Sequence, residues 1–533
     1  MSTLVDPRAH LATGAATGLP ARGRSVSRDR TLLAIGSTLV YLSVMAVLSS
    51  RDLLFTDGVS RVANGYYALA SRDPHLAAIG FVWNPLPSIL SLPLLCLAPL
   101  WRPLASLGLA GSIPVAIAGG VTVAVLHTAL QRLGVGRWLT LALSVLYALH
   151  PYIVLAAASG TSETLMLLWL VLSTSALIRW VSHDEPMSLV MAGSALALAY
   201  LTRYEALAAA IGVGAGVALV SALRNRQKRF PYILNDLIIV LLPTAYAFAL
   251  WAVASKLIVD QWFAQFSSSY GNSSQVSFAS DAIAKLGTGP LGRVGYALTQ
   301  ASALQPLLVA LLLLAAWVSI RKARLDAAVP IAVFAAVLAF QWATLAMGGS
   351  FGFLRYAVSG IPLAVLCGGA VLSSLRGSAR IARALIVAAL CVAIPSSIWV
   401  LGQPTLAREE SLMSLSGRAG QHSMEREIAK WLDAHGLPEG SVLTDVAYSG
   451  PIVVASSDPR QFVITTDRDF AAILADPKTH GVRYVLVTKH EVSPADAVER
   501  QYPGMYASGG GIATPVKEWR DARDYTWRLF QLK

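Results

Sequence analysis

Runs of about 20 consecutive apolar residues recur between residues 31 and 402, and they constrain the fold more than any other feature of the sequence. Each run is long enough to cross the hydrocarbon core of a bilayer as a helix. Of the 533 residues, 55% are hydrophobic and only 14% are charged, which is too apolar for a soluble chain of this length. The sequence therefore predicts an α-helical polytopic membrane protein.

Short basic loops between the apolar runs predict the topology. By the positive-inside rule these loops are cytoplasmic, as is the N-terminal tail 1–30, whose Ala, Gly, Ser and Arg content indicates disorder. The net charge of +12 is explained by these loops and is no sign of nucleic-acid binding. Counting crossings gives about eleven spans in the plasma membrane, N-terminus inside and C-terminus outside. The basic loops are 132–137, 179–185, 224–229, 321–324 and 376–383.

The same count divides the chain into domains. Residues 31–402 form the membrane domain, with outer loops at 51–108 and 256–305. The apolar piece from Asn84 to Pro99 cannot be a full crossing, because parity and its prolines exclude one. We expect it to pack as a juxtamembrane or re-entrant element on the outer face. The three cysteines lie in apolar segments without metal or disulfide spacing.

Residues 403–533 differ in composition and predict a small soluble α/β domain outside the membrane. Helices are expected at 425–435 and 469–474. Strands are expected at 442–444, 452–455, 462–464, 484–487 and 527–530.

The first candidate for chemistry is Asp57, just after the first span. An amphipathic helix should follow it and lie in the interface plane, with Asp57 at its N-terminus facing water and Arg61 on another face. Asp57 could simply favour the helix dipole, or it could be a base that deprotonates an acceptor hydroxyl. The apolar positions of this helix are Val59, Val62, Tyr66 and Leu69.

A second outer turn holds Glu163, at the start of an apolar run. Glu163 could be an N-terminal helix carboxylate, or a second acid beside Asp57 that touches the acceptor or ligates a divalent cation. His150 and Tyr152 precede this turn and are expected in the substrate pocket, His150 as a packed histidine rather than a base.

Two arginines near membrane depth are the remaining candidates for chemistry. A charged group costs free energy there, so its presence indicates a function. Arg203 could pair with Glu205 two residues later, or its guanidinium fork could bind a phosphate. Arg355 follows a glycine-rich outer turn and could snorkel to the interface or act as a second phosphate ligand. Arg61 and Lys285 are further candidates for phosphate binding. The expected substrate pocket comprises Asn84, His150, Tyr152, Glu205 and Tyr356.

The order of these pieces resembles the membrane-embedded glycosyltransferases of the GT-C superfamily, which include lipid A aminoarabinose transferases and protein O-mannosyltransferases. The resemblance covers residues 31–375. It rests on the loop of Asp57, on Asn84-Pro85-Leu86-Pro87, on the turn before Glu163 and on a long outer loop after the seventh span. The second acid of the family's first loop is Gly58 here, and the paired Asp-x-Asp/Glu pattern of its metal-dependent members is absent.

The resemblance implies transfer of a sugar from a polyprenyl-phosphate-sugar donor to a cell-envelope acceptor at the outer face, with inversion. Asp57 and Glu163 map onto the family's catalytic acids, and Arg203 and Arg355 would stabilise the departing phosphate. The resemblance establishes no cofactor and leaves open a divalent cation such as Mg²⁺ or Mn²⁺, held by Asp57 and Glu163. Membrane lipids are the other expected partners. A lipid or polyprenyl-phosphate flippase and a non-catalytic envelope scaffold are the alternatives.

Overall fold

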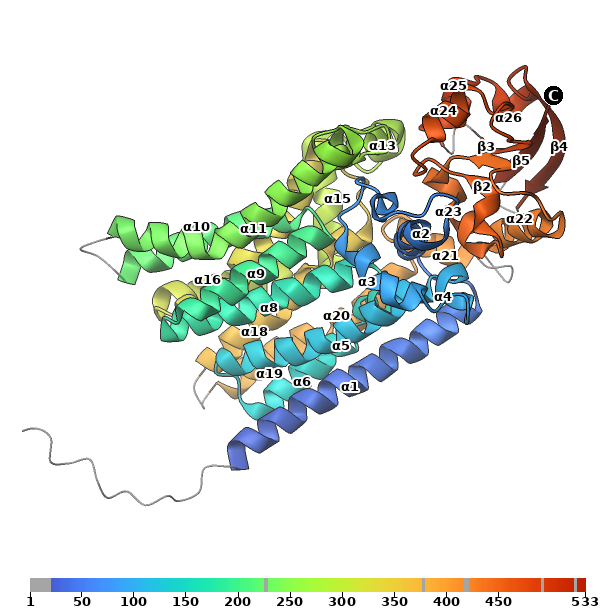
Figure 1. Ribbon diagram of the computed structural model, residues 1–533. Helices are drawn as coiled ribbons and strands as arrows, with labels where there is room; N and C mark the ends of the chain where they lie inside the picture. Colours follow the sequence, from blue (N-terminus) through green and yellow to red (C-terminus); the bar gives the residue numbers. More distant parts are fainter. Residues whose placement is uncertain (1–20, 225–228, 376–378, 416–420, 490–492, 522–524) are drawn as a thin grey trace, which may run out of the picture.

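The computed structural model describes residues 21–224, 229–375, 379–415, 421–489, 493–521 and 525–533. A bundle of long helices carries the C-terminal domain at one end, while the start of α1 (Ala21–Ser50) lies at the other end (Figure 1). Because α1 is helical from Ala21, the expected disordered tail is wrong for residues 21–30, and residues 1–20 lie outside the described ranges. Residues 225–228 and 376–378, which belong to two predicted basic loops, also lie outside the described ranges.

The helices confirm a polytopic membrane protein. In the described ranges, eight helical segments are long and apolar enough to cross a membrane, or up to ten if each of two bent pairs counts as one span. The predicted number of about eleven spans is reached only if the 17-residue apolar helix α9 (Pro186–Thr202) also crosses the membrane. The eight segments are Ser27–Ser50, Leu109–Arg132, Ser162–His183, Ala206–Arg224, Phe230–Val259, Leu325–Ala346, Leu354–Ser374 and Arg380–Leu401.

Both bent pairs break at a short polar or proline-containing junction. Helices α6 (Arg137–Ala148) and α7 (Pro151–Ala158) meet at 58°, because Pro151 cannot continue the hydrogen bonding of α6. Helices α15 (Gly289–Leu304) and α16 (Leu308–Arg321) meet at 83°.

The bundle is built on three long helices that pack side by side. Helix α8 (Ser162–His183) lies between α5 (Leu109–Arg132) and α9, and α1 packs along α5. Helix α18 (Gly360–Ser374) is central and almost wholly buried. The remaining helices of the bundle are α10 (Ala206–Arg224), α11 (Arg229–Val259), the π-helical turn η3 (Ile331–Ala335) with α17 (Ala336–Ala346), α19 (Arg380–Cys391) and α20 (Ala393–Leu401).

Short helices form a layer between the bundle and the C-terminal domain (Figure 1). Helix α2 (Thr56–Ala70) is the predicted amphipathic helix, and it packs on α3 (Leu86–Leu95) and α5. Helix α3 has ten residues, too few to cross a bilayer, as expected for the proline-broken piece. The layer also contains η1 (Leu76–Ile79) and α4 (Pro103–Ser106). The loop 256–305, which is predicted to lie outside, contains α12 (Ala264–Ser267), α13 (Asn272–Phe278) and α14 (Ser280–Ala284).

The C-terminal domain contains a five-stranded sheet in the order β2-β1-β3-β5-β4. Strand β1 pairs in parallel with β2 and with β3, whereas β5 pairs antiparallel with β3 and with β4. The strands are β1 (Val442–Thr444), β2 (Phe462–Val463), β3 (Tyr484–Thr488), β4 (Ala513–Arg520) and β5 (Thr526–Leu532). The helices are α21 (Arg408–Leu415), α22 (Ser423–Ala434), α23 (Val446–Ala455), α24 (Phe470–Ala475), α25 (Ala497–Gln501) and α26 (Met505–Ser508).

One predicted strand is wrong, because residues 452–455 belong to helix α23. The Asp445 carboxylate accepts a hydrogen bond from the Ala447 N–H and thereby caps this helix. A short buried apolar run has no periodicity that separates strand from helix.

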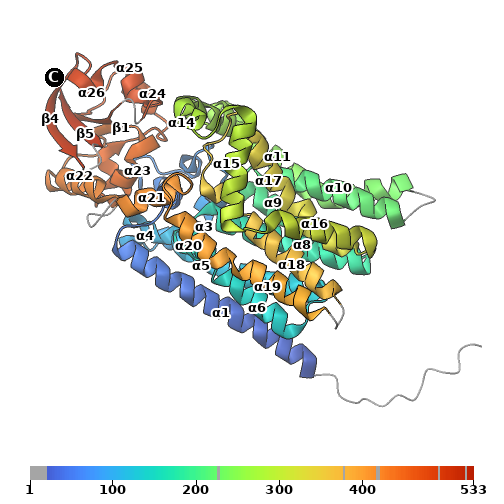
Figure 2. The same cartoon turned by 180° about the vertical axis from the view of Figure 1, so that it is seen from behind.

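The C-terminal domain docks on α2 through α23. An added Cβ on Gly450 of α23 would lie 2.9 Å from the Tyr67 hydroxyl of α2, so the two helices approach closely. Beyond α2, Arg72 pairs with Asp467 at 3.0 Å and Asp73 pairs with Arg468 at 2.5 Å. Helix α21 lies where the bundle meets this domain, between α20 and α22 (Figure 2).

Candidate active site

Arg355 is the centre of a buried charged cluster at the end of the bundle that carries the C-terminal domain. Its Nη1 atom lies 2.5 Å from Oδ2 of Asp57 and 3.2 Å from Oε1 of Glu409, and its Nε lies 3.5 Å from Oε1 of Glu163. Only 7% of Arg355 is exposed, so it does not snorkel to a membrane surface. Three carboxylates from separate helices therefore converge on one guanidinium.

Arg203 joins the same cluster through Glu163. Its Nη1 lies 2.6 Å from Oε1 of Glu163, and its Nη2 lies 2.6 Å from Oε1 of Glu205. The predicted pairing of Arg203 with Glu205 is thus present, and Gln341 also donates to Glu205 at 3.0 Å. The ring of Tyr356 lies under both guanidiniums, 5.6 Å from Cζ of Arg355 and 5.9 Å from Cζ of Arg203. Such contacts favour the charged form of both arginines.

Glycines bring the backbones of α2 and the turn before α8 into contact. An added Cβ on Gly58 would lie 2.6 Å from the carbonyl oxygen of Ser159, a distance that real Cβ atoms do not reach. Gly160 has a φ of +74°, a left-handed conformation that other residues adopt at a cost. Asp57 and Glu163, each at a helix N-terminus, are held close to Arg355 by this backbone contact.

The Arg61 side chain of α2 is buried. Its guanidinium stacks on Trp83 at 4.4 Å and donates to the carbonyl of Asn84 at 3.4 Å. The Asn84 side chain in turn donates to the carbonyl of Tyr200 at 2.5 Å. Arg61 lies close enough to Asp57 that its charge acts on the pKa of that carboxyl.

Burial alone would raise the pKa of Asp57, but the charges of Arg355, Arg61 and Arg203 outweigh burial and lower it below its usual range. Asp57 is therefore ionised at neutral pH and able to accept a proton.

Sequence reasoning missed two acids of this cluster, Glu409 and Glu410 on the first turn of α21. Glu409 contacts Arg355, and Glu410 accepts a hydrogen bond from the hydroxyl of Tyr152 at 2.7 Å. An adjacent acid pair directly after the last span was the available signal, but the pair falls in a segment assigned to the soluble domain.

Two predicted site residues lie outside these contacts. His150 is buried, with Nε2 3.2 Å from the carbonyl oxygen of Leu304 and 3.0 Å from the hydroxyl of Ser397, which is the packed arrangement expected for it. Its place in the substrate pocket stays a prediction. Lys285 is exposed just after α14 and takes no part in the cluster.

The donors of the cluster do not fit a divalent cation. Among the described residues no group of three His, Cys, Asp or Glu side chains is placed to hold a metal ion. Oxygen-binding cations need several free carboxylate or carbonyl oxygens, whereas here Asp57, Glu163 and Glu205 contact guanidinium nitrogens.

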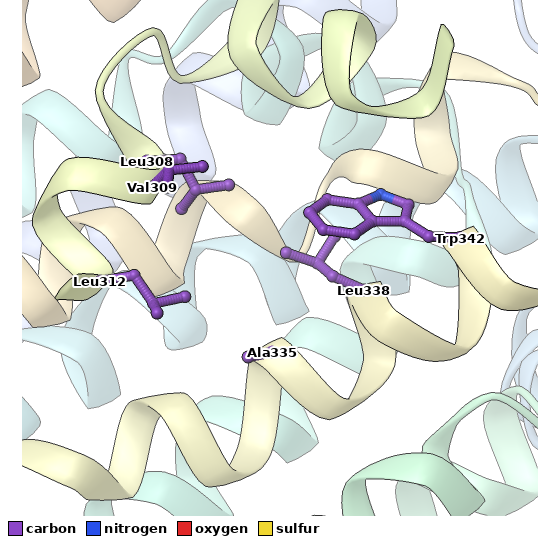
Figure 3. A pocket seen from close by; sticks show the side chains of 6 residues that line it. All are labelled: Leu308, Val309, Leu312, Ala335, Leu338 and Trp342. Carbon is purple, nitrogen blue, oxygen red and sulfur yellow. The ribbon is translucent and has the colours of Figure 1, made fainter. Parts of the chain in front are cut away.

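An apolar cavity of about 180 Å³ lies between α16 and the helix formed by η3 and α17 (Figure 3). Trp342, which lines it, follows Gln341, the residue that bonds Glu205. The cavity therefore shares α17 with a residue that contacts the charged cluster, and none of the described side chains that line it is ionisable. It is lined by Leu308, Val309, Leu312, Ala335, Leu338 and Trp342.

The fold of this chain and part of its sequence are similar to those of known proteins. Residues 105–257 match the family described as dolichyl-phosphate-mannose-protein mannosyltransferase. No curated protein sequence matches the chain significantly.

Thirteen chains of solved structures match this one significantly, among them the following two. One is ArnT from Cupriavidus metallidurans bound to undecaprenyl phosphate, with 13% sequence identity, a TM-score of 0.54, and coverage of 96% of this chain and 98% of that one. The other is the archaeal oligosaccharyltransferase AglB from Archaeoglobus fulgidus in complex with an inhibitory peptide and a dolichol-phosphate. It has 11% identity, a TM-score of 0.42, and coverage of 92% and 74%. The fold is similar to that of ArnT over nearly the whole length of both chains, and the match of residues 105–257 to a mannosyltransferase family agrees with the predicted resemblance to the GT-C superfamily.

Proposed function

We propose that the protein transfers a sugar from a polyprenyl-phosphate-sugar to a cell-envelope acceptor at the extracytoplasmic face of the membrane. The observation that carries the proposal is the Asp57–Arg355 ion pair within a cluster of buried acids and arginines. Sugar transfer from a phosphate needs a base for the acceptor hydroxyl and cations for the departing phosphate, and both are present. The family match and the undecaprenyl phosphate bound by the similar ArnT support a lipid-linked donor.

In the proposed reaction Asp57 takes the proton of the acceptor hydroxyl as the oxygen attacks the anomeric carbon. The bond from that carbon to the phosphate oxygen breaks, and its electron pair leaves with the polyprenyl phosphate. Arg355 and Arg203 stabilise the charge that develops on this phosphate. A single displacement inverts the anomeric configuration.

The ion pair also links donor binding to the strength of the base. Arg355 is the strongest of the charges that lower the pKa of Asp57. When Arg355 turns toward a phosphate, Asp57 loses part of this effect and its pKa rises, so it becomes a better proton acceptor. Donor binding would thus prepare Asp57 for the acceptor.

The apolar cavity beside α17 offers a surface for the hydrocarbon part of such a donor, and its position next to Gln341 supports a lipid substrate. The described charged cluster lies at one end of the bundle, which favours an enzyme over a flippase with a polar path across the membrane.

The test is the full-length protein in nanodiscs, assayed with a panel of polyprenyl-phosphate-sugars and envelope acceptors. Asp57→Asn should lower transfer at least about 100-fold while donor binding persists. Asp281→Asn, at an exposed outer-loop acid, is the matched control and should transfer like the native protein. Undiminished turnover by Asp57→Asn would refute the assignment.

A further inference from the structure

Glu409 is a mostly buried acid that the proposed reaction does not use. It contacts the same atom of Arg355, Nη1, that Asp57 contacts, but at 3.2 Å rather than 2.5 Å. Its side chain is 16% exposed, and its second oxygen, Oε2, is buried without a hydrogen-bond partner among the described residues. A buried polar atom without a partner is unfavourable, so this oxygen is available to a ligand.

Charge balance around Arg355 indicates that one of its acids carries a proton. Three carboxyl groups, from Asp57, Glu163 and Glu409, converge on this one guanidinium. Glu163 also pairs with Arg203, and Asp57 makes the shortest contact with Arg355. Glu409 is therefore the acid whose negative charge is least compensated by a cation. An excess of buried negative charge is unfavourable, and protonation is the usual response.

The electrostatics around Glu409 agree with this balance. Burial raises the pKa of Glu409 to about 8, with Arg355 opposing and Asp57, Glu410 and Glu163 adding to the rise. Two carboxyl groups on one guanidinium nitrogen therefore have pKa values displaced in opposite directions, with Asp57 ionised and Glu409 neutral at pH 7. Such a division is typical of acids with separate roles.

We propose that Glu409, in its neutral form, donates a hydrogen bond to the phosphate group that Arg355 binds. This inference rests on the proposed function and adds a phosphate-binding residue to its site. The hydroxyl of the neutral acid donates to a non-bridging phosphate oxygen, no covalent bond changes, and the proton stays on Glu409. An ionised Glu409 would instead repel the phosphate and compete with it for Arg355.

The position of Glu409 suits this role. Helix α21, which carries Glu409, follows the last span and lies where the bundle meets the C-terminal domain (Figure 2). Arg355 lies in the 3-10 turn Leu354–Ala357, just before α18. A phosphate between them would be held by donors from both parts of the protein.

The experiment measures undecaprenyl phosphate binding to the full-length protein in nanodiscs from about pH 7 to about pH 9. This range lies above the second pKa of a phosphate monoester, about 6, so the charge of the ligand stays constant. The affinity of the native protein should fall about tenfold, as Glu409 loses its proton. Glu409→Gln keeps a neutral donor and should vary less than about threefold. Glu427→Gln, at an exposed acid of α22, is the control and should follow the native curve.

The outcomes separate this inference from the proposed function. Binding by the native protein with no pH response, or a Glu409→Gln curve that falls like the native one, rejects the role of Glu409 alone. No binding by the native protein at any pH rejects the lipid-phosphate function and this role with it. If Glu409→Gln does not fold, the protonation of Glu409 in the native protein is followed instead, by infrared titration of the carboxyl band. A midpoint near pH 8 supports the inference, and its absence overturns it.

Discussion

Asp57 and Arg355 form an ion pair of 2.5 Å although they are 298 positions apart in the chain. The pair joins α2, in the layer beneath the C-terminal domain, to the start of the central span. The Arg355 side chain is 9% exposed and that of Asp57 is 27% exposed, so the pair lies at the edge of the buried cluster.

Replacement of Arg355 by lysine should lower transfer by about 100-fold or more, because an ammonium group cannot contact three carboxylates as a planar guanidinium does. The free energy of unfolding should fall by about 1–3 kcal/mol, since some buried acids lose their partner. Activity assays with thermal unfolding check both. Arg293→Lys is the control and should change little, because among the described residues Arg293 hydrogen-bonds to the carbonyl of Ala346 alone. Equal effects of the two variants would contradict the central role of Arg355.

Gly58→Ala should displace the start of α2, because the new methyl would meet the Ser159 carbonyl oxygen at 2.6 Å. Such overpacking costs about 1–3 kcal/mol of unfolding free energy, and transfer should fall as Asp57 moves from Arg355. Gly36→Ala in α1 is the matched control, since nothing lies within 4 Å of that Cβ, and alanine there should be neutral or stabilising. Thermal melts of both variants give the comparison, and a Gly58→Ala melt at the native temperature would argue against the close contact.

Arg72→Ala should loosen the C-terminal domain far more than Arg468→Ala. Burial raises the pKa of Asp467 to about 6, Arg72 opposes this rise, and the Asp467 side chain has no exposed surface. Without Arg72 an unpaired acid is left buried, at about 3 kcal/mol. Arg468 is 69% exposed, and its pair with Asp73 contributes about 0–1 kcal/mol. Limited proteolysis between the two parts measures the difference, and similar cleavage rates would count against it.

Asp496 should make stability fall with rising pH. Burial and the nearby charge of Asp445 raise its pKa to about 7, against about 3.9 for an unfolded chain. Between these values the folded protein binds more protons than the unfolded one, so the unfolding free energy decreases as pH rises from about 4 to about 7.

Asp496→Asn should remove this contribution and stabilise the protein by about 2 kcal/mol at pH 8, because asparagine also caps α25. Thermal unfolding at about pH 5 and pH 8 tests it, with Asp281→Asn as an exposed control. A larger gain at pH 5 than at pH 8 would reverse the sign and exclude the explanation.

The convergence of Asp57, Glu163, Arg203 and Arg355 could be predicted from the sequence, because basic loops fix which ends of the apolar runs lie together. Which acid pairs with which arginine could not, since that depends on how α2, α8 and α18 pack. Periodicity could not foresee the burial of Arg61 either, because stacking on Trp83 is a contact between separate elements.

The remaining differences have local causes. Glu409 was missed because α21 folds back against the bundle, while composition assigns it to the soluble domain. The start of α1 was placed ten residues late, because its first turns are polar and hydropathy marks only the apolar part. Residues 452–455 fit strand and helix equally well until the cap at Asp445 decides for the helix.

The pairing of both arginines with side chains of the same protein has a further consequence. Any anion that reaches Arg355 or Arg203 must exchange with a carboxylate that is tethered beside it at a high local concentration. Free phosphate in solution competes poorly under such conditions, whereas a ligand confined to two dimensions by a hydrocarbon tail meets the site far more often. On the proposed function, internal ion pairing would thereby favour ligands delivered by the bilayer.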